Sequence, residues 1–321
     1  MNKKPIIIVA GEPYSTFLEI FFKIIKKNNF KQPIILIVSK TLLLSQMHEL
    51  GYKYNVKLLD KKLINFNKIN NAHINIIDVE FKSTKPFGKI SIKSNSYINN
   101  CFDVAVELIK KRNCSGLLNG AISKKHFLKN KFFGITEYLA HKTKTKKFSM
   151  LIYNKNLSVS PITTHLPLKE VNKNISKKKI INHVNLITRF YIKQFNKKPR
   201  IAITGLNPHC ESNYKSSEED RLIIPTIKHL IKKKISVEGP FPADTIFMKN
   251  KLKQFDVIIG MYHDQVLTPM KAIFGFNAIN ITIGLPFIRI SPDHGPNSPM
   301  LGKNLSNPKS LLESMRFLDR K

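Results

Sequence analysis

Short apolar runs alternate with amphipathic segments along this 321-residue chain, and this alternation constrains the fold more than any other feature. Runs that are apolar at every position suit strands buried on both faces of a sheet. The predicted strands are residues 5–11, 33–39, 74–79, 116–122, 148–153, 200–207, 256–262 and 278–284. The predicted helices are residues 16–28, 99–113, 177–195, 217–234 and 309–319. This order predicts an α/β protein with a largely parallel sheet.

Several classes of protein are disfavoured by the composition. No apolar run approaches the roughly 20 residues of a membrane span. The apolar stretch near the start, "IIIVA", is short and ends at "GEP", which indicates a first strand rather than a signal peptide. Three cysteines without a C-x-x-C pair argue against a disulfide scaffold. We therefore expect a cytoplasmic protein with no membrane partner.

The net charge of +33 raises the possibility of a basic nucleic-acid-binding protein. Only seven of the 54 basic residues are arginine, however, and the chain has no tryptophan. Proteins that read nucleic acids favour arginine forks and interleaved aromatic residues. A solvated lysine-rich surface with no specific nucleic-acid partner is the preferred interpretation, and nucleic-acid binding stays an unlikely alternative.

The spacing of the glycines excludes the common nucleotide-binding loops. None of the thirteen glycines forms a G-x-G pair, so neither the G-x-G-x-x-G fingerprint nor a Walker A loop is present. If the protein binds a dinucleotide, it does so without a Rossmann glycine turn.

Three histidines lie where strand-like runs give way to loops, namely His165, His209 and His263. Ligands of open α/β sheets gather beyond the carboxyl ends of strands. Three neutral imidazoles hold a divalent metal and leave a position open for substrate. Their spacing matches no local metal motif, so ordinary polar roles remain the alternative.

Other polar residues along the chain are candidates for binding a ligand. Lys271, Asn280 and Arg289 can together bind a phosphate or carboxylate, because the arginine fork fits oxyanions bidentately. Asp244, in a proline-rich turn, suits either a cofactor contact or a helix N-cap. Thr136 stands at a predicted helix start.

Taken together, these segments resemble the 4-hydroxythreonine-4-phosphate dehydrogenase family over nearly the whole chain. The resemblance rests on "GEP" (11–13), "AISK" (121–124), "TEYLA" (136–140), "TTHLPL" (163–168), "GLNPH" (205–209), "GPFPADT" (239–245), "YHDQ" (262–265) and "INITIGLPFIRISPDHG" (279–295). They occur in the family's order.

The resemblance implies NAD(P)-dependent oxidation of 4-phosphooxy-L-threonine at C3, followed by decarboxylation to 3-amino-2-oxopropyl phosphate, in pyridoxine 5'-phosphate biosynthesis. It implies one divalent metal per subunit (zinc, magnesium or cobalt) and a homodimer with interfacial active sites. It also implies a two-domain fold like that of isocitrate and isopropylmalate dehydrogenases. We expect one domain of residues 1–125 plus 295–321, a second of residues 126–294, and the active site in the cleft between them.

The family's functional residues map onto this chain residue by residue. Its metal ligands correspond to His165, His209 and His263, and its substrate-binding residues to Thr136, Lys271, Asn280 and Arg289. Lys271 and Asp264 are the candidate catalytic residues, and Asp244 and Asn207 are candidate cofactor contacts.

The chain departs from the family pattern at two places. Ile135 stands where the family usually has histidine, and "CESNY" (210–214) replaces a glycine-rich stretch. These departures keep a second function open, in which a dehydrogenase of the same fold oxidises another phosphorylated hydroxy acid or a cyclic diol.

Overall fold

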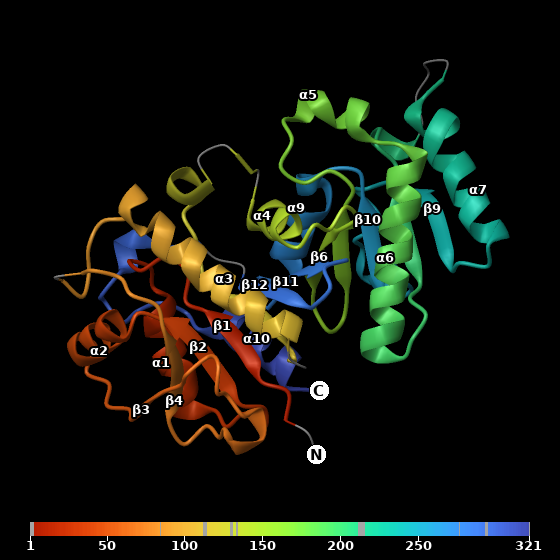
Figure 1. Cartoon of the computed structure of the whole chain (residues 1–321). Coiled ribbons are helices and arrows are strands. Elements are labelled where there is room, and N and C mark those ends of the chain that lie inside the picture. The colour runs from red at the N-terminus through yellow and green to blue at the C-terminus, as the bar shows by residue number, and fades with distance from the viewer. Residues whose placement is uncertain are drawn as a thin grey trace. The chain divides into compact units, whose positions relative to one another are not determined.

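The computed structural model describes residues 3–83, 85–111, 114–128, 131–132, 134–210, 216–275, 277–292 and 295–320. The chain divides into two compact units. Unit 1 comprises residues 1–143 and 286–321, and unit 2 comprises residues 144–285. Each unit is built around its own strands and helices, as Figure 1 shows.

Unit 1 contains parallel strands in the order β3-β4-β2-β1-β5-β12. Their bounds are β1 (Ile6–Val9), β2 (Ile34–Val38), β3 (Val56–Leu58), β4 (Ile74–Asp78), β5 (Gly116–Asn119) and β12 (Arg289–Pro292). β1 and β2 are buried at every position, as expected for strands covered on both faces.

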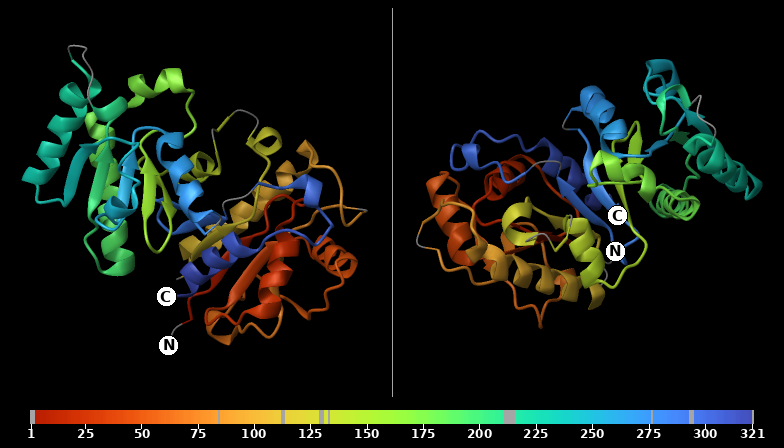
Figure 2. Two further views of the ribbon diagram at one scale, coloured as in Figure 1. Left: turned by 180° about the vertical axis from the view of Figure 1, so that it is seen from behind. Right: turned by 90° about the horizontal axis from the view of Figure 1, so that it is seen from above.

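The helices of unit 1 cover this sheet. They are α1 (Phe17–Lys27), α2 (Lys40–Glu49), α3 (Asn95–Lys111), α4 (Ile135–Lys142) and α10 (Lys309–Asp319). α3 packs on β1, β2 and β5, and α10 packs on β1, β5 and β12. The first strand, in red, and the last helix, in blue, therefore lie side by side in Figure 2. The two ends of the chain meet in one unit.

Unit 2 contains strands in the order β11-β6-β7-β10-β8-β9. Their bounds are β6 (Ser149–Tyr153), β7 (Ser158–Pro161), β8 (Ile201–Thr204), β9 (Val237–Phe241), β10 (Val257–Gly260) and β11 (Ile279–Ile283). β7, β10, β8 and β9 are parallel, whereas β6 pairs antiparallel with both β7 and β11. The carboxyl ends of β7, β10 and β8 consequently share one edge of the sheet.

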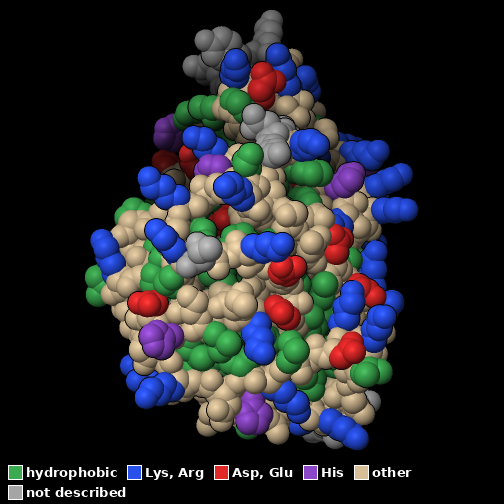
Figure 3. Space-filling view, turned by 60° about the vertical axis from the view of Figure 1, so that its left-hand side comes forward, with side chains coloured by type: hydrophobic (Ala, Val, Ile, Leu, Met, Phe, Trp, Pro, Cys, Tyr) green, Lys and Arg blue, Asp and Glu red, His purple; other side chains and the backbone are tan. Residues whose placement is uncertain are grey.

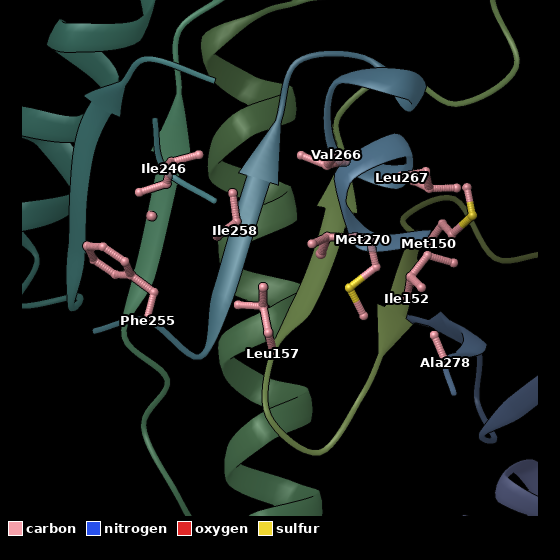
Figure 4. Close-up of a cluster of buried hydrophobic side chains, with 12 residues drawn as sticks. Met150, Ile152, Leu157, Ile246, Phe255, Ile258, Val266, Leu267, Met270 and Ala278 are labelled. Atoms are coloured by element: carbon pink, nitrogen blue, oxygen red, sulfur yellow. The ribbon is translucent and has the colours of Figure 1, made fainter. Parts of the chain in front are cut away.

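The helices of unit 2 are α5 (Leu168–Val171), α6 (Lys177–Phe195), α7 (Ile224–Lys232), α8 (Lys249–Leu252) and α9 (His263–Phe274). A wide helical turn, Glu219–Ile223, precedes α7. Figure 4 shows side chains of α9 and of the strands meeting in the core of this unit. Burial of Val266, Leu267 and Met270 stabilises the docking of α9 by roughly 1.5–3 kcal/mol for each side chain.

The α/β fold predicted from the sequence is confirmed. Each of the eight predicted strands contains an observed strand, and each predicted helix contains or overlaps an observed helix, with α3 beginning four residues before its predicted start. The units divide near residues 143 and 285, whereas we expected boundaries near 125 and 295. The physical reason lies in packing. Tyr138 of α4 makes ring contacts with Phe102 and Phe127, and β12 pairs with β5, so both segments belong to unit 1.

The surface is rich in lysine. Figure 3 shows basic side chains spread over the face in view, with acidic side chains between them. This distribution resembles a solvated surface more than a continuous basic stripe. Among the residues that the structure describes, no helix is both long and apolar enough to cross a bilayer.

Candidate active site

Arg289 is a buried cation of unit 1. Arg289 is the first residue of β12, and it is 3% exposed. Its Nε donates to Asn119 Oδ1 at 2.8 Å, and its Nη1 donates to Thr136 Oγ1 at 3.3 Å. Asn119 ends β5 and Thr136 lies in the first turn of α4, so two separate elements fix the plane of the guanidinium.

Burial lowers the pKa of Arg289 to about 10, and the nearby Glu137 carboxylate works in the opposite direction. The guanidinium therefore keeps its charge at neutral pH. A charge held in a buried site is costly unless a counter-charge or strong hydrogen bonds accompany it. Such a site suits an anionic group, which the arginine fork binds bidentately.

His165 and His263 are brought together in unit 2. They follow the neighbouring parallel strands β7 and β10, and their ring centroids lie 5.8 Å apart. Two imidazoles bound to one tetrahedral zinc ion have ring centres roughly 5 Å apart, because each nitrogen lies roughly 2.1 Å from the metal. The spacing of these two rings therefore fits a shared metal ion.

His263 is the first residue of α9, and its Nδ1 lies 2.7 Å from Asp264 Oδ1. A carboxylate on one ring nitrogen orients an imidazole and leaves the other nitrogen for a metal. The Asp264 side chain is 80% exposed, whereas the His263 side chain is 35% exposed. The structure thus places Asp264 beside the candidate metal ligand.

His209 follows β8, on the other side of β10 from β7. It is exposed, and its backbone is left-handed at φ 56°, which is uncommon for a residue with a side chain. Within the described residues, no group of three or more histidine, cysteine or acidic side chains could hold a metal. Residues 211–214 of the predicted variant loop lie outside the described residues, and Cys210 is partly buried.

Asn207 is part of a hydrogen-bond network at the start of this loop. Its amide nitrogen donates to Glu218 Oε2 at 2.9 Å and to Glu219 Oε2 at 2.8 Å. Glu219 is 1% exposed and also accepts from the backbone nitrogens of Leu206 and Asn207. Burial raises the pKa of Glu219, but the hydrogen bonds from Asn207 and Leu206 outweigh it and lower the pKa overall. An ionised Glu219 therefore holds the loop that carries His209.

The remaining predicted residues lie elsewhere in unit 2. Lys271 is in α9, about 12 Å along the helix axis from His263, and it is exposed. Asn280 is on β11, and its buried Oδ1 has no hydrogen-bond partner among the residues that the structure describes. Asp244 lies in an exposed turn after β9. A buried amide oxygen without a hydrogen-bond partner among the described residues is consistent with a ligand contact at Asn280.

Sequence reasoning assigned no role to Asn119, Glu219 or Gln265. Gln265 is 9% exposed and lies two residues after His263 in the same helix. Each of these residues acts through a partner brought near by folding, as Asn119 does for Arg289. The one usable signal was the polar "YHDQ" sequence directly after an apolar strand.

An α/β architecture with a buried arginine whose environment suits an anion, and with histidines beyond the carboxyl ends of parallel strands, is typical of a class of enzymes that act on anionic substrates. The family model of the pyridoxal phosphate biosynthetic protein PdxA matches residues 29–318. The chain therefore belongs to this family, and the resemblance stated from the sequence motifs is confirmed.

Relatives and solved structures agree with this assignment. The 4-hydroxythreonine-4-phosphate dehydrogenase of Sulfurihydrogenibium sp. (strain YO3AOP1) is 37% identical over 97% of this chain and 96% of its own length. The D-threonate 4-phosphate dehydrogenase of Salmonella typhimurium is 28% identical over 99% of this chain and 98% of its own length. The crystal structure of 4-hydroxythreonine-4-phosphate dehydrogenase from Klebsiella pneumoniae has a TM-score of 0.84 and 27% identity, with 98% of both chains covered.

Proposed function

We propose that the protein is a nicotinamide-dependent dehydrogenase that oxidises 4-phosphooxy-L-threonine at C3 and releases carbon dioxide, giving 3-amino-2-oxopropyl phosphate. The observation that carries this proposal is the buried Arg289, held by Asn119 and Thr136 in a chain of the PdxA family. A guanidinium in such a site binds a phosphate more strongly than an exposed lysine does, because water competes less.

The substrate is anchored by its phosphorylated end. Arg289 and Thr136 bind the phosphate oxygens, and Lys271 and Asn280 complete the polar contacts. These contacts hold the C3 hydroxyl in one orientation for hydride transfer, and this positioning lowers the entropic cost of the reaction. A bound NAD or NADP would supply the hydride acceptor. Asp244 and Asn207 are the proposed cofactor contacts, with the Asn207 amide already oriented by Glu218 and Glu219.

His165 and His263 are the proposed metal ligands on geometric grounds, and His209 is the third. A divalent metal bound there supplies a Lewis acid that polarises the substrate oxygen. Asp264 orients the His263 ring through Nδ1. Asp264 and Lys271 are the residues proposed to move or stabilise protons near the reacting carbons.

We also propose a homodimer with active sites at the subunit interface, working in the cytoplasm. The support for this proposal is the resemblance of the sequence motifs to a family, which implies a homodimer, and the match to the PdxA family model. Measurement of the solution mass, with and without substrate, tests this proposal, and a monomer that is fully active would overturn it.

A second substrate, D-threonate 4-phosphate, is favoured by one observation. Ile135 precedes Thr136 at the start of α4, is 9% exposed, and offers no hydrogen-bonding group. The Salmonella typhimurium relative is named for this substrate, which also carries a phosphate and a hydroxy acid.

A steady-state assay separates the two substrates. Purified protein is assayed with each phosphate ester, with NAD and with NADP, before and after treatment with a chelator. We expect higher kcat/KM for 4-phosphooxy-L-threonine and loss of activity on chelation that cobalt restores. Higher kcat/KM for D-threonate 4-phosphate would replace the first function with the second, and full activity after chelation would remove the metal role.

A further inference from the structure

We propose that Gln265 is a positioning residue for the metal centre. Its side chain connects the three segments of unit 2 that carry the histidines. This inference rests on the proposed function, since it concerns the ligands His165, His209 and His263. The segments follow β7, β8 and β10, which are adjacent parallel strands. Two of the three ligands are exposed, so their positions depend on the backbone that carries them.

The link between the His263 and His165 segments is the peptide group of Met261. Its carbonyl oxygen accepts from Thr163 Oγ1 at 2.7 Å and from Thr163 N at 3.2 Å. Thr163 lies two residues before His165, and Met261 lies two residues before His263. Thr163 and Met261 are 3% and 0% exposed, so water does not compete for these bonds.

The link to the His209 segment is the side chain of Gln265. Its Oε1 accepts from Met261 N at 2.7 Å and from Thr204 Oγ1 at 2.8 Å. Its Nε2 donates to the carbonyl oxygen of Gly205 at 2.8 Å. Thr204 ends β8, and His209 lies in the loop that follows. We call this set of bonds, from Thr163 through Met261 and Gln265 to Thr204 and Gly205, the Met261 tie.

The chemistry of the tie requires an amide at position 265. Met261 N is a donor and Gly205 O is an acceptor, so the side chain between them needs an acceptor on one atom and a donor on the other. Glutamine meets both demands, whereas glutamate at neutral pH and methionine do not. The close approach also requires Gly260, because an added Cβ there would lie 2.5 Å from Val266 Cγ1 and 3.1 Å from Gln265 Oε1.

Packing of α9 against the core of unit 2 fixes the position of Gln265. Val266, Leu267 and Met270 of α9 lie in the core cluster with strand residues, as Figure 4 shows. Gln265 therefore projects from a fixed helix and transmits that position to the two neighbouring segments. Outer-shell residues that orient metal ligands typically change metal affinity by about 10–100-fold when they are replaced.

The test is a cobalt titration of metal-free protein, followed by visible absorption, with Gln265→Met as the main variant. We expect Gln265→Met to weaken Co²⁺ binding by about 10–100-fold and to change the absorption bands of bound Co²⁺. Thr204→Val removes one hydroxyl of the tie with little change of shape, and we expect a smaller loss in the same direction. This second variant keeps the test open if Gln265→Met does not fold.

The matched control is Tyr191→Phe. The Tyr191 hydroxyl donates to Ser158 Oγ at 2.8 Å and also bonds the carbonyl oxygen of Asp256, at the amino ends of β7 and β10. This variant loses buried hydrogen bonds on the same strands at their opposite ends, so it should lower stability and leave Co²⁺ affinity unchanged.

The outcomes separate the two proposals. Wild-type affinity in both Gln265→Met and Thr204→Val, even with a lower melting temperature, would overturn the role of Gln265 and leave the metal centre standing. Equal Co²⁺ binding by wild type and His263→Asn would overturn the metal centre itself, and the role of Gln265 with it.

Discussion

The two units hold their candidate functional side chains in place in different ways. In unit 1, Arg289 is buried and directly bonded to Asn119 and Thr136. In unit 2, His165 and His209 are exposed, and order comes from buried groups behind them, such as Gln265 and Glu219. A buried cation must be held by its own contacts, whereas an exposed ligand can be held through its backbone.

The same comparison applies to one buried basic side chain in each unit. Arg289 keeps its proton in unit 1, while His183 in unit 2 gives its proton up, because burial lowers its pKa to about 3. The Ser160 hydroxyl donates to the carbonyl oxygen of Met150, so it accepts a hydrogen bond from His183 Nε2. His183 Nδ1 then accepts from Ser149 at 2.9 Å. A neutral imidazole fits this pair of partners.

The largest expected effect tests the buried cation. Arg289→Met should lower kcat/KM for the phosphorylated substrate by about 10³-fold, mainly through KM, because a charged hydrogen-bonded partner of the phosphate is lost. Steady-state kinetics measures this change. The control is Arg316→Met, whose side chain is 52% exposed and pairs with Glu313. A KM within twofold of wild type for Arg289→Met would show that the phosphate binds elsewhere.

The next effect tests the exposed ligands. His263→Asn should weaken metal binding by more than the roughly 10–100-fold of an outer-shell change, because a ligand itself is removed. Metal content after gel filtration, and competition with a fluorescent chelator, measure the affinity. His48→Asn is the control, since the His48 side chain is 89% exposed. Unchanged metal content in His263→Asn would contradict the assignment.

A smaller effect concerns His183 and pH. The unfolded chain binds a proton at His183 below about pH 6.5, whereas the folded protein does not until about pH 3. The free energy of unfolding should therefore fall as pH decreases, by about 2 kcal/mol between pH 6.5 and pH 5 from this residue. Urea unfolding across this range measures it. In His183→Gln the free energy of unfolding should fall less steeply as the pH decreases. An equally steep fall in that variant would assign the effect to other groups.

The smallest effect concerns the partner of Arg289. Asn119→Asp preserves the shape of the side chain but places a carboxylate beside the guanidinium, where it competes with the substrate phosphate. We expect KM to rise by about tenfold, with stability maintained, since one charged hydrogen bond contributes roughly 1.5–3 kcal/mol. Asn67→Asp, on an exposed turn, adds the same charge as a control. A lower KM in Asn119→Asp would contradict an anion site at Arg289.

Sequence patterns predicted the strands that are mainly apolar and missed β3, β7, β9 and β12, which are shorter or more polar. β7 reads "SVSP", yet all of its positions are buried. Ser158 is satisfied by Tyr191, and Ser160 by His183 and Met150, so polar residues become suitable for a core only after folding. β9 contains glycine and proline, and β12 begins with arginine, which also masks strand character.

Some features of the candidate site were also predicted from the sequence, and others were not. His165 and His263 were predicted to share a site because each follows a strand-like run, although β7, the strand before His165, was itself not predicted. The helical start of α9 at His263 was not predicted, because Pro269 interrupts the pattern inside the helix. The roles of Asn119 and Glu219 depend on hydrogen bonds to distant parts of the chain, which no local pattern records.

Met261 contacts Gln265 and Thr163 through its main-chain N–H and carbonyl groups, and these hydrogen bonds do not involve its side chain. Leucine could replace this methionine in a redesigned enzyme and leave the neighbouring segments joined. Proline could not, since it lacks the N–H that Gln265 requires. Residue identity alone would thus be a poor guide to what this position tolerates.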